Sequence, residues 1–179
     1  MILAHDECNF MGNEGNPGFF VVVSAPRAAK DVIITSGKLR GPVRSRKWHP
    51  NPFWDHRHVL LTPRQIREIG PRHTSIIAIP TLVSYFVSRG TTIHSPLLLD
   101  GVPHEPTRRG LESAIASVAP WLEVEYHIGG DKTSEPIAEA DRIAYLLFDR
   151  YRCGEYEKYH RASRLKPSIE KFRKFIPER

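Results

Sequence analysis

Two short apolar runs place the strongest constraint on the fold of this 179-residue chain. Residues 19–23 are Phe-Phe-Val-Val-Val, and residues 96–100 are Pro-Leu-Leu-Leu-Asp. The first run is rich in β-branched and aromatic residues, and the second is too short for a helix, so both predict strands. A continuous apolar strand, rather than an alternating one, is typical of a strand covered on both faces. The chain therefore predicts an α/β fold, a sheet flanked by helices.

Periodicity elsewhere gives the order of the predicted elements. Apolar segments at residues 2–4, 19–23 and 31–35 predict three strands in an N-terminal meander. Alternation at residues 122–128 predicts a half-exposed strand after the one at 96–100. Apolar spacings of three and four predict helices, which cover residues 75–88, 107–120 and 135–151. The predicted order is β-β-β-α-β-α-β-α.

Residues 38–75 differ from their surroundings because they are rich in arginine, histidine, tryptophan and proline. Within them Thr62 is a suitable N-cap, Pro63 a suitable first helical residue and Gly70 a suitable end. We therefore expect an insertion that carries one short helix.

The formal net charge of +6 is concentrated at the C-terminal end. Residues 1–149 carry 16 basic and 16 acidic side chains, whereas residues 150–179 carry 10 basic and 4 acidic ones. We expect one domain, residues 1–151, followed by a basic tail, residues 152–179, that packs on it. Within that tail a helix is predicted at residues 168–175.

Other classes of protein are disfavoured by the sequence. No apolar run reaches the roughly 20 residues that span a bilayer, and the first residues do not resemble a signal peptide. We therefore expect a cytoplasmic protein without a membrane partner. Cys8 and Cys153 are 145 positions apart, which fits neither a disulfide framework nor a metal motif, so reduced thiols are expected.

Three aspartates stand in locally apolar surroundings. Asp6 belongs to the first predicted strand, Asp100 ends the fourth, and Asp141 lies in the second turn of the last helix. Ionised carboxylates avoid such places unless they are paired or bind a cation. Each has a structural alternative, a turn or cap residue for Asp100 and solvated surface for the other two. Their joint pattern indicates a cation site.

The segments around these aspartates are similar to motifs of a known family. Residues 130–144, from Gly130-Asp131-Lys132 through Ala140-Asp141-Arg142, resemble the closing motif of the uncharacterised ribonuclease H-like family known as domain of unknown function 3800. That family carries Asp-Glu-Ser-Gly on its first strand, where residues 6–9 here read Asp-Glu-Cys-Asn. The middle match is residues 98–101. The resemblance implies a ribonuclease H-like fold, with a mixed five-stranded sheet flanked by helices and a basic C-terminal extension.

The resemblance also implies a two-metal site. In enzymes of this fold converging carboxylates hold two Mg²⁺ or Mn²⁺ ions, a role that falls here on Asp6, Asp100 and Asp141. Hard divalent cations prefer carboxylate oxygens, and a pair of them can activate water and stabilise the leaving oxygen of a phosphodiester.

A fourth acid is usual in such sites. The candidates close enough in sequence are Glu7, Asp131 and Glu135, and Glu7 joins the three aspartates as a candidate catalytic residue. Lys132 is a candidate contact to a substrate phosphate.

The segment between Lys38 and Arg57 offers a second candidate contact to nucleic acid. Its basic groups can neutralise phosphates while exposed rings stack on bases. The candidate substrate-binding residues are Arg44, Arg46, Lys47 and Trp48. The alternative is a solvated loop anchored by buried tryptophans. A zinc site is a less favoured alternative, because no cysteine lies near its possible ligands His49, Asp55, His56 and His58.

These features predict a metal-dependent phosphodiesterase of ribonuclease H type that acts on RNA, DNA or a hybrid. The alternative is a non-catalytic nucleic-acid-binding module that retains the fold, which the altered motif at residues 6–9 suggests. A nucleotide- or cofactor-binding α/β enzyme is disfavoured, because no glycine-rich phosphate loop follows a predicted strand.

Overall fold

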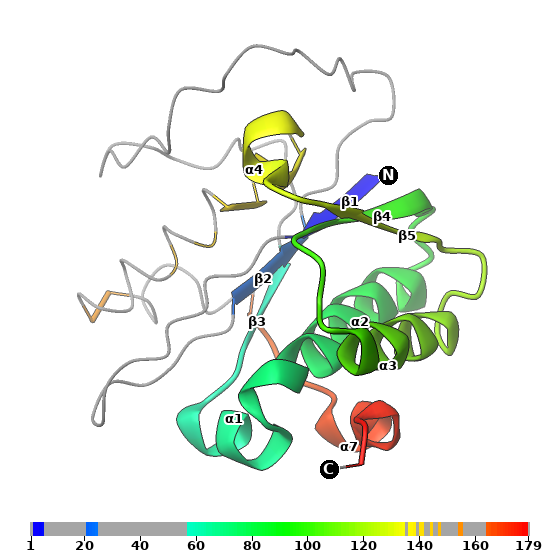
Figure 1. Ribbon diagram of the computed structural model, residues 1–179. Helices are drawn as coiled ribbons and strands as arrows, with labels where there is room; N and C mark the ends of the chain where they lie inside the picture. Colours follow the sequence, from blue (N-terminus) through cyan, green and yellow to red (C-terminus); the bar gives the residue numbers. More distant parts are fainter. Residues whose placement is uncertain are drawn as a thin grey trace.

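The computed structural model describes residues 57–134 and 164–178, and between them residues 136–138, 140, 141, 144, 147, 154 and 155. Of residues 2–5 and 21–24 it describes the backbone. Within these residues the chain forms a mixed α/β fold with two small sheets and several helices (Figure 1). None of the described helices is both long and apolar enough to cross a membrane.

The first sheet contains the candidate site. Its strands are β1 (Ile2–His5), β4 (His94–Asp100) and β5 (Val124–His127), in the order β1-β4-β5, and all are parallel. His5 pairs with Leu99, and Asp100 pairs with His127. The carboxyl ends of the three strands therefore meet at one edge of the sheet.

The second sheet differs from the sequence prediction. It contains β2 (Val21–Ser24), β3 (Arg57–Leu60) and β6 (Arg164–Leu165), with β3 antiparallel to β2 and parallel to β6. β3 lies within residues 38–75, for which the sequence predicts an insertion with one short helix, and this strand was not predicted. The polar residues Arg57 and His58 give no strand signal in the sequence, yet His58 is fully buried and Val59 belongs to the main core cluster. The strand predicted at residues 31–35 lies outside the described residues.

Helices cover both faces of β4, as its continuous apolar run predicts. Leu97 and Leu99 belong to the main core cluster together with residues of α2 (Thr74–Ser88) and α3 (Glu105–Ala116). Leu98 points to the opposite face and forms a separate cluster with Ile137. Figure 1 shows α2 and α3 side by side on one face of the sheet.

The short helix α1 (Pro63–Ile69) confirms the capping prediction. The Gln65 N–H donates to Thr62 Oγ1 at 3.3 Å, and the Thr62 N–H donates to Gln65 Oε1 at 2.8 Å, which is a capping box. Gly70 ends the helix at φ +92°, a left-handed conformation that glycine adopts without steric cost.

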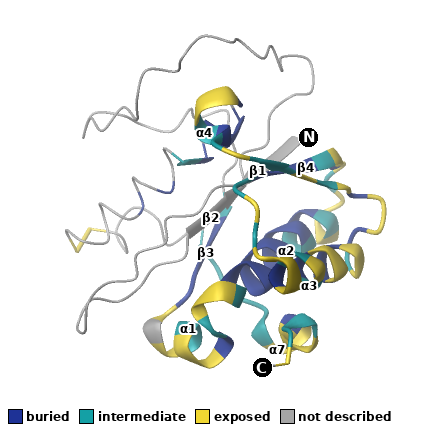
Figure 2. Cartoon of the chain, in the orientation of Figure 1, coloured by how far each residue is buried: buried dark blue, intermediate teal, exposed yellow. Residues whose placement is uncertain are grey.

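The two long helices depart from the prediction in detail. α2, which follows the 3-10 helix η2 (Pro71–His73), is buried on all sides from Thr74 to Val83, whereas the sequence predicts one buried face (Figure 2). It lies between the sheet, α3 and the C-terminal segment, so solvent reaches little of it. α3 begins at Glu105, two residues before the predicted cap Thr107, and ends at Ala116.

The C-terminal segment contributes to the core. The predicted helix at residues 168–175 is α7 (Ile169–Phe172) followed by the 3-10 helix η4 (Arg173–Phe175). Phe172 is fully buried in the main core cluster, and the segment contacts both α2 and α3. The described strands form two sheets of three, and a single mixed sheet of five is not seen among them.

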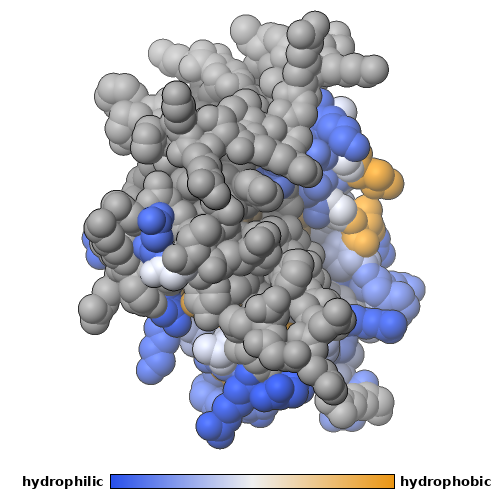
Figure 3. Space-filling model, turned by 90° about the vertical axis from the view of Figure 1, so that its left-hand side faces the viewer, coloured by the Kyte–Doolittle hydropathy of each residue, from blue (hydrophilic) through white to orange (hydrophobic). Residues whose placement is uncertain are grey.

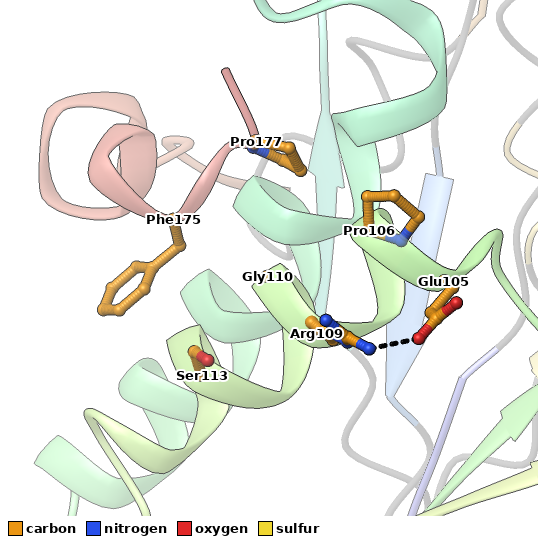
Figure 4. Close-up of a pocket in the computed structure, with 7 residues that line it drawn as sticks. All are labelled: Glu105, Pro106, Arg109, Gly110, Ser113, Phe175 and Pro177. Atoms are coloured by element: carbon orange, nitrogen blue, oxygen red, sulfur yellow. Dashed lines mark hydrogen bonds and ion pairs between the residues drawn. The ribbon is translucent and has the colours of Figure 1, made fainter. Parts of the chain in front are cut away.

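Close packing of this segment on α3 generates a prediction at Gly110 (Figure 4). A Cβ atom at Gly110 would overlap the carbonyl oxygen of Phe175 and lie 2.9 Å from Ile76 Cδ1. We expect Gly110→Ala to lower the free energy of unfolding by about 1–3 kcal/mol, because backbone must shift to admit the methyl group.

Urea denaturation measures this change, with Ser113→Ala on the next turn of α3 as the control. At an unobstructed helix position alanine is about 1 kcal/mol more favourable than glycine. A stabilised Gly110→Ala protein would therefore contradict the close contact.

Candidate functional site

Asp100 is the last residue of β4 and stands at the carboxyl edge of the parallel sheet. Its neighbour across the sheet is His127, whose carbonyl accepts the Gly101 N–H at 2.8 Å. In open α/β sheets, ligands bind outside the carboxyl ends of the strands. The position of Asp100 therefore marks this edge as the candidate site.

A hydrogen bond fixes the Asp100 carboxylate. The Gly130 N–H, at the start of α4 (Gly130–Thr133), donates to Asp100 Oδ1 at 2.6 Å. The close approach of residue 130 to the end of β5 favours glycine, because a Cβ at Gly130 would lie 2.6 Å from Ile137 Cδ1 and 2.9 Å from His127 Cβ. Three segments thus meet at Gly130, namely the ends of β4 and β5 and the start of the following helical segment.

Asp141 lies on that helical segment, of which residues 136–138, 140, 141, 144 and 147 are described. Its predicted apolar stripe is confirmed, since Ile137, Ala140, Ala144 and Leu147 are buried. Ile137 packs against Leu98, and side chains two apart on a strand share a face, so Asp100 belongs to the same face as Leu98. Half-buried Asp141, one turn beyond Ile137, is therefore carried by the helix on the Asp100 side of the sheet.

The other predicted site residues divide into two groups. Asp131 is half-buried and Lys132 is exposed, both on α4 next to Gly130. His58 is the described member of the possible zinc set, and it is buried in β3. The remaining candidates lie outside the described residues, and these are Asp6, Glu7, Arg44, Arg46, Lys47, Trp48, His49, Asp55, His56 and Glu135.

Sequence reasoning missed His127 as a site residue. Its Nε2 lies 2.9 Å from Glu125 Oε1, and the residue ends β5 opposite Asp100. The available signal was its place just before Gly129, where the alternating strand stops.

The carboxylate oxygens at the Asp100 edge are the type of ligand that binds a hard divalent cation. Gly130 occupies one oxygen of Asp100, and the second oxygen retains acceptor capacity. Mg²⁺ and Mn²⁺ favour such carboxylate oxygens. Within the described part of the chain, no three His, Cys, Asp or Glu side chains form a group that could hold a metal ion. The predicted set depends on Asp6, which lies outside that part.

Exposed apolar side chains lie in the loops that leave the same edge. Figure 3 shows hydrophobic side chains beside hydrophilic ones on the surface of the described residues. Val102 follows β4 and is 51% exposed, and Ile128 follows β5 and is 87% exposed. The half-exposed strand predicted over residues 122–128 is shorter in the structure, because β5 ends at His127 and excludes Ile128. The edge thus offers apolar contacts next to a carboxylate.

Away from the Asp100 edge, a hollow of about 400 Å³ lies between α3 and the C-terminal segment (Figure 4). Phe175 and Pro177 line one side of it, and Glu105 forms an ion pair with Arg109 on the other. Glu105 is its one described carboxylate, and that carboxylate is already neutralised by Arg109. This hollow therefore lacks the donor chemistry of the Asp100 edge.

The Asp100–Gly130 hydrogen bond predicts different effects for two substitutions. Asp100→Ala removes the acceptor of a part-buried N–H, so we expect a loss of about 1–3 kcal/mol in the free energy of unfolding. Asp100→Asn keeps a carbonyl oxygen in place, and we expect a loss below about 1 kcal/mol. Chemical denaturation without divalent cations measures both, and equal losses would show that the hydrogen bond is not what holds this edge.

The Asp100 edge thus joins a fixed carboxylate, a histidine and exposed apolar side chains at the carboxyl ends of parallel strands. Comparisons with protein-family models, with curated proteins and with solved structures found no match. The function is therefore argued from this geometry and from the sequence motifs.

Proposed function

We propose that this chain is a metal-dependent phosphodiesterase of ribonuclease H type that cleaves RNA, DNA or a hybrid. The observation that carries the proposal is the parallel register of β1 and β4. His5, the last residue of β1, pairs with Leu99. The residues that follow these two in the sequence are Asp6 and Asp100, so the register supports a site to which both strands contribute.

The strand pairings support the fold that this function requires. β2 and β3 pair antiparallel, β1 pairs with β4, and β4 pairs with β5 in parallel. β1 and β2 also lie in contact. Hydrogen bonding between β1 and β2 would join the two sheets into one mixed sheet of order β6-β3-β2-β1-β4-β5. Apart from the two-residue strand β6, this order would be the five-stranded sheet that the sequence motifs imply.

The packing of Ile137 on Leu98 supports Asp141 as the third aspartate of the proposed cation site. That contact attaches the helical segment carrying Asp141 to the face of β4 to which Asp100 belongs. Helix and strand thus approach the same edge from one side, as a shared cation site requires.

In this proposal Asp6, Asp100 and Asp141 hold Mg²⁺ or Mn²⁺, with Glu7, Asp131 or Glu135 as a further ligand. When bound, these ions would supply an activated water and charge stabilisation for the leaving oxygen. Gly130 holds the Asp100 carboxylate in one orientation, so little reorganisation precedes binding.

Lys132 is exposed on α4, two residues beyond Gly130, from where its ammonium group can contact a substrate phosphate. The basic candidates Arg44, Arg46 and Lys47, with Trp48, would extend the contact along the strand of nucleic acid.

A cleavage assay on single-stranded, duplex and hybrid substrates, with Mg²⁺ or Mn²⁺, tests the proposal. We expect the native protein to cleave at least one substrate, and Asp100→Asn and Asp141→Asn to lower the rate by about 100-fold or more, as loss of a transition-state-stabilising group does. Chelation of the metal should abolish cleavage.

Glu123→Gln is the matched control. Glu123 is exposed and precedes β5, so Glu123→Gln removes one carboxylate at the end of the strand opposite the Asp100 edge. Equal rates in native, Asp100→Asn and Asp141→Asn proteins would contradict the proposal. Nucleic-acid binding without cleavage would favour the non-catalytic module instead.

A further inference from the structure

Asp100 also lines a cleft of about 340 Å³ between the beginnings of α2 and α3. The floor of the cleft is apolar and is made by three buried side chains, Ile79, Leu99 and Leu111. Its walls are polar, and the polar side chains that matter below are Arg72, Ser75, His104 and Thr107. The volume is at the lower end of small-ligand pockets, which start at about 300 Å³.

Two helix N-termini face this cleft. α2 has 15 residues and begins at Thr74, and α3 has 12 residues and begins at Glu105. Their N-cap residues, His73 and His104, make no side-chain capping hydrogen bond. The first N–H groups of a helix carry partial positive charge and are suited to bind anions.

Ser75 gives an independent indication of a ligand. It is only 8% exposed and lines the cleft from the first turn of α2. Its neighbours are satisfied, since Thr74 Oγ1 donates to the Pro71 carbonyl at 3.0 Å and Thr107 Oγ1 donates to the Arg72 carbonyl at 3.2 Å. No residue of the described chain bonds the Ser75 hydroxyl. The residue is largely buried and lines the cleft, so its hydroxyl can donate to an acceptor that binds there.

The charges of the cleft define the ligand. Exposed Arg72 and His104 stand at its rim, and the Thr107 bond to the Arg72 backbone fixes the start of that wall. Asp100 is the one carboxylate among the described lining residues. Hydrogen-bond donors and apolar side chains lining one cleft suit an anion attached to an organic group, which is the chemistry of a phosphate ester.

We propose that this cleft binds a phosphate group carried on a nucleotide. The Ser75 hydroxyl and the first N–H groups of α2 donate to the phosphate oxygens, Arg72 supplies positive charge, and the apolar floor contacts the attached sugar. That the phosphate belongs to a nucleic-acid strand bound beside Asp100 rests on the proposed function, whereas phosphate binding itself does not.

Binding measurements by calorimetry or NMR, with metal chelated, test the proposal. The probes are inorganic phosphate, a nucleoside monophosphate and a dinucleoside phosphodiester. We expect the monophosphate to bind more tightly than inorganic phosphate, and Ser75→Ala and Arg72→Gln each to weaken it about tenfold, as loss of a charge-assisted hydrogen bond does. Arg64→Gln, an exposed charge on α1 outside the cleft lining, should leave affinity unchanged.

The source of the phosphate is read from the third probe. Binding of the phosphodiester at the monophosphate's affinity, with the same sensitivity to Ser75→Ala, supports a strand within the cleft. Binding of the monophosphate alone supports a free nucleotide or a strand end.

Three outcomes would overturn the proposal. These are no binding of any probe, equal affinity in native and Ser75→Ala proteins, and equal weakening by Arg64→Gln. A ligand role also predicts that Ser75→Ala keeps the melting temperature of the unliganded protein, because no described hydrogen bond is lost.

Asp100→Asn separates this proposal from the cleavage proposal. Because the Asp100 carboxylate bonds Gly130 on the Leu98 face of the sheet, whereas Leu99 and the cleft lie on the other face, Asp100→Asn should leave phosphate binding unchanged while cleavage is lost. Phosphate binding in a protein that cleaves nothing would support the cleft and contradict the nuclease, and cleavage without any phosphate binding would do the reverse.

Discussion

The burial of β4 on both faces is the constraint on which the rest of the structure depends. Leu97 and Leu99 face α2 and α3, and Leu98 faces Ile137. With no solvent on either side, the backbone of β4 must find its hydrogen bonds in neighbouring strands, which β1 and β5 supply. Parallel neighbours require helical crossovers, and these crossovers are the helices that cover the sheet. The apolar run ends at Asp100, so a polar side chain follows it where all three strands end together.

The Asp100–Gly130 hydrogen bond connects this architecture to chemistry. It holds a carboxylate against an N–H donor where a side chain on Gly130 would collide with Ile137 and His127. A carboxylate held in this way loses little freedom when it binds a cation. The packing that buries Ile137 therefore also orients Asp100, which explains why one glycine, one aspartate and one apolar residue occur together at this edge.

The sequence predicted those parts of the fold that depend only on residues close together in the chain. Thr62, Gln65 and Gly70 define both ends of α1 by hydrogen bonds within a few residues, and the stripe through Ile137 follows helical spacing. Other features depend on partners distant in sequence. β3 gives a polar pattern because Arg57 and His58 precede two apolar residues, and its hydrogen-bonding partners, β2 and β6, lie far from it in the sequence. Of the site, Asp100 and the Asp141 helix could be predicted from short motifs, whereas the Gly130 contact and the cleft at Ser75 arise from tertiary packing.

Net charge conceals the electrostatic character of the Asp100 edge. The chain carries +6, and residues 1–149 are neutral. At the edge, however, the Asp100 carboxylate bonds Gly130 on the Leu98 face, whereas the N-terminal ends of α2 and α3 and Arg72 line the cleft on the Leu99 face. An acidic group and an anion-binding wall thus lie on opposite faces of one strand end, so they do not compete for one ligand. A divalent ion on Asp100 would neutralise its charge and make the edge more attractive to a phosphate, so the proposed metal and phosphate sites favour each other's occupation.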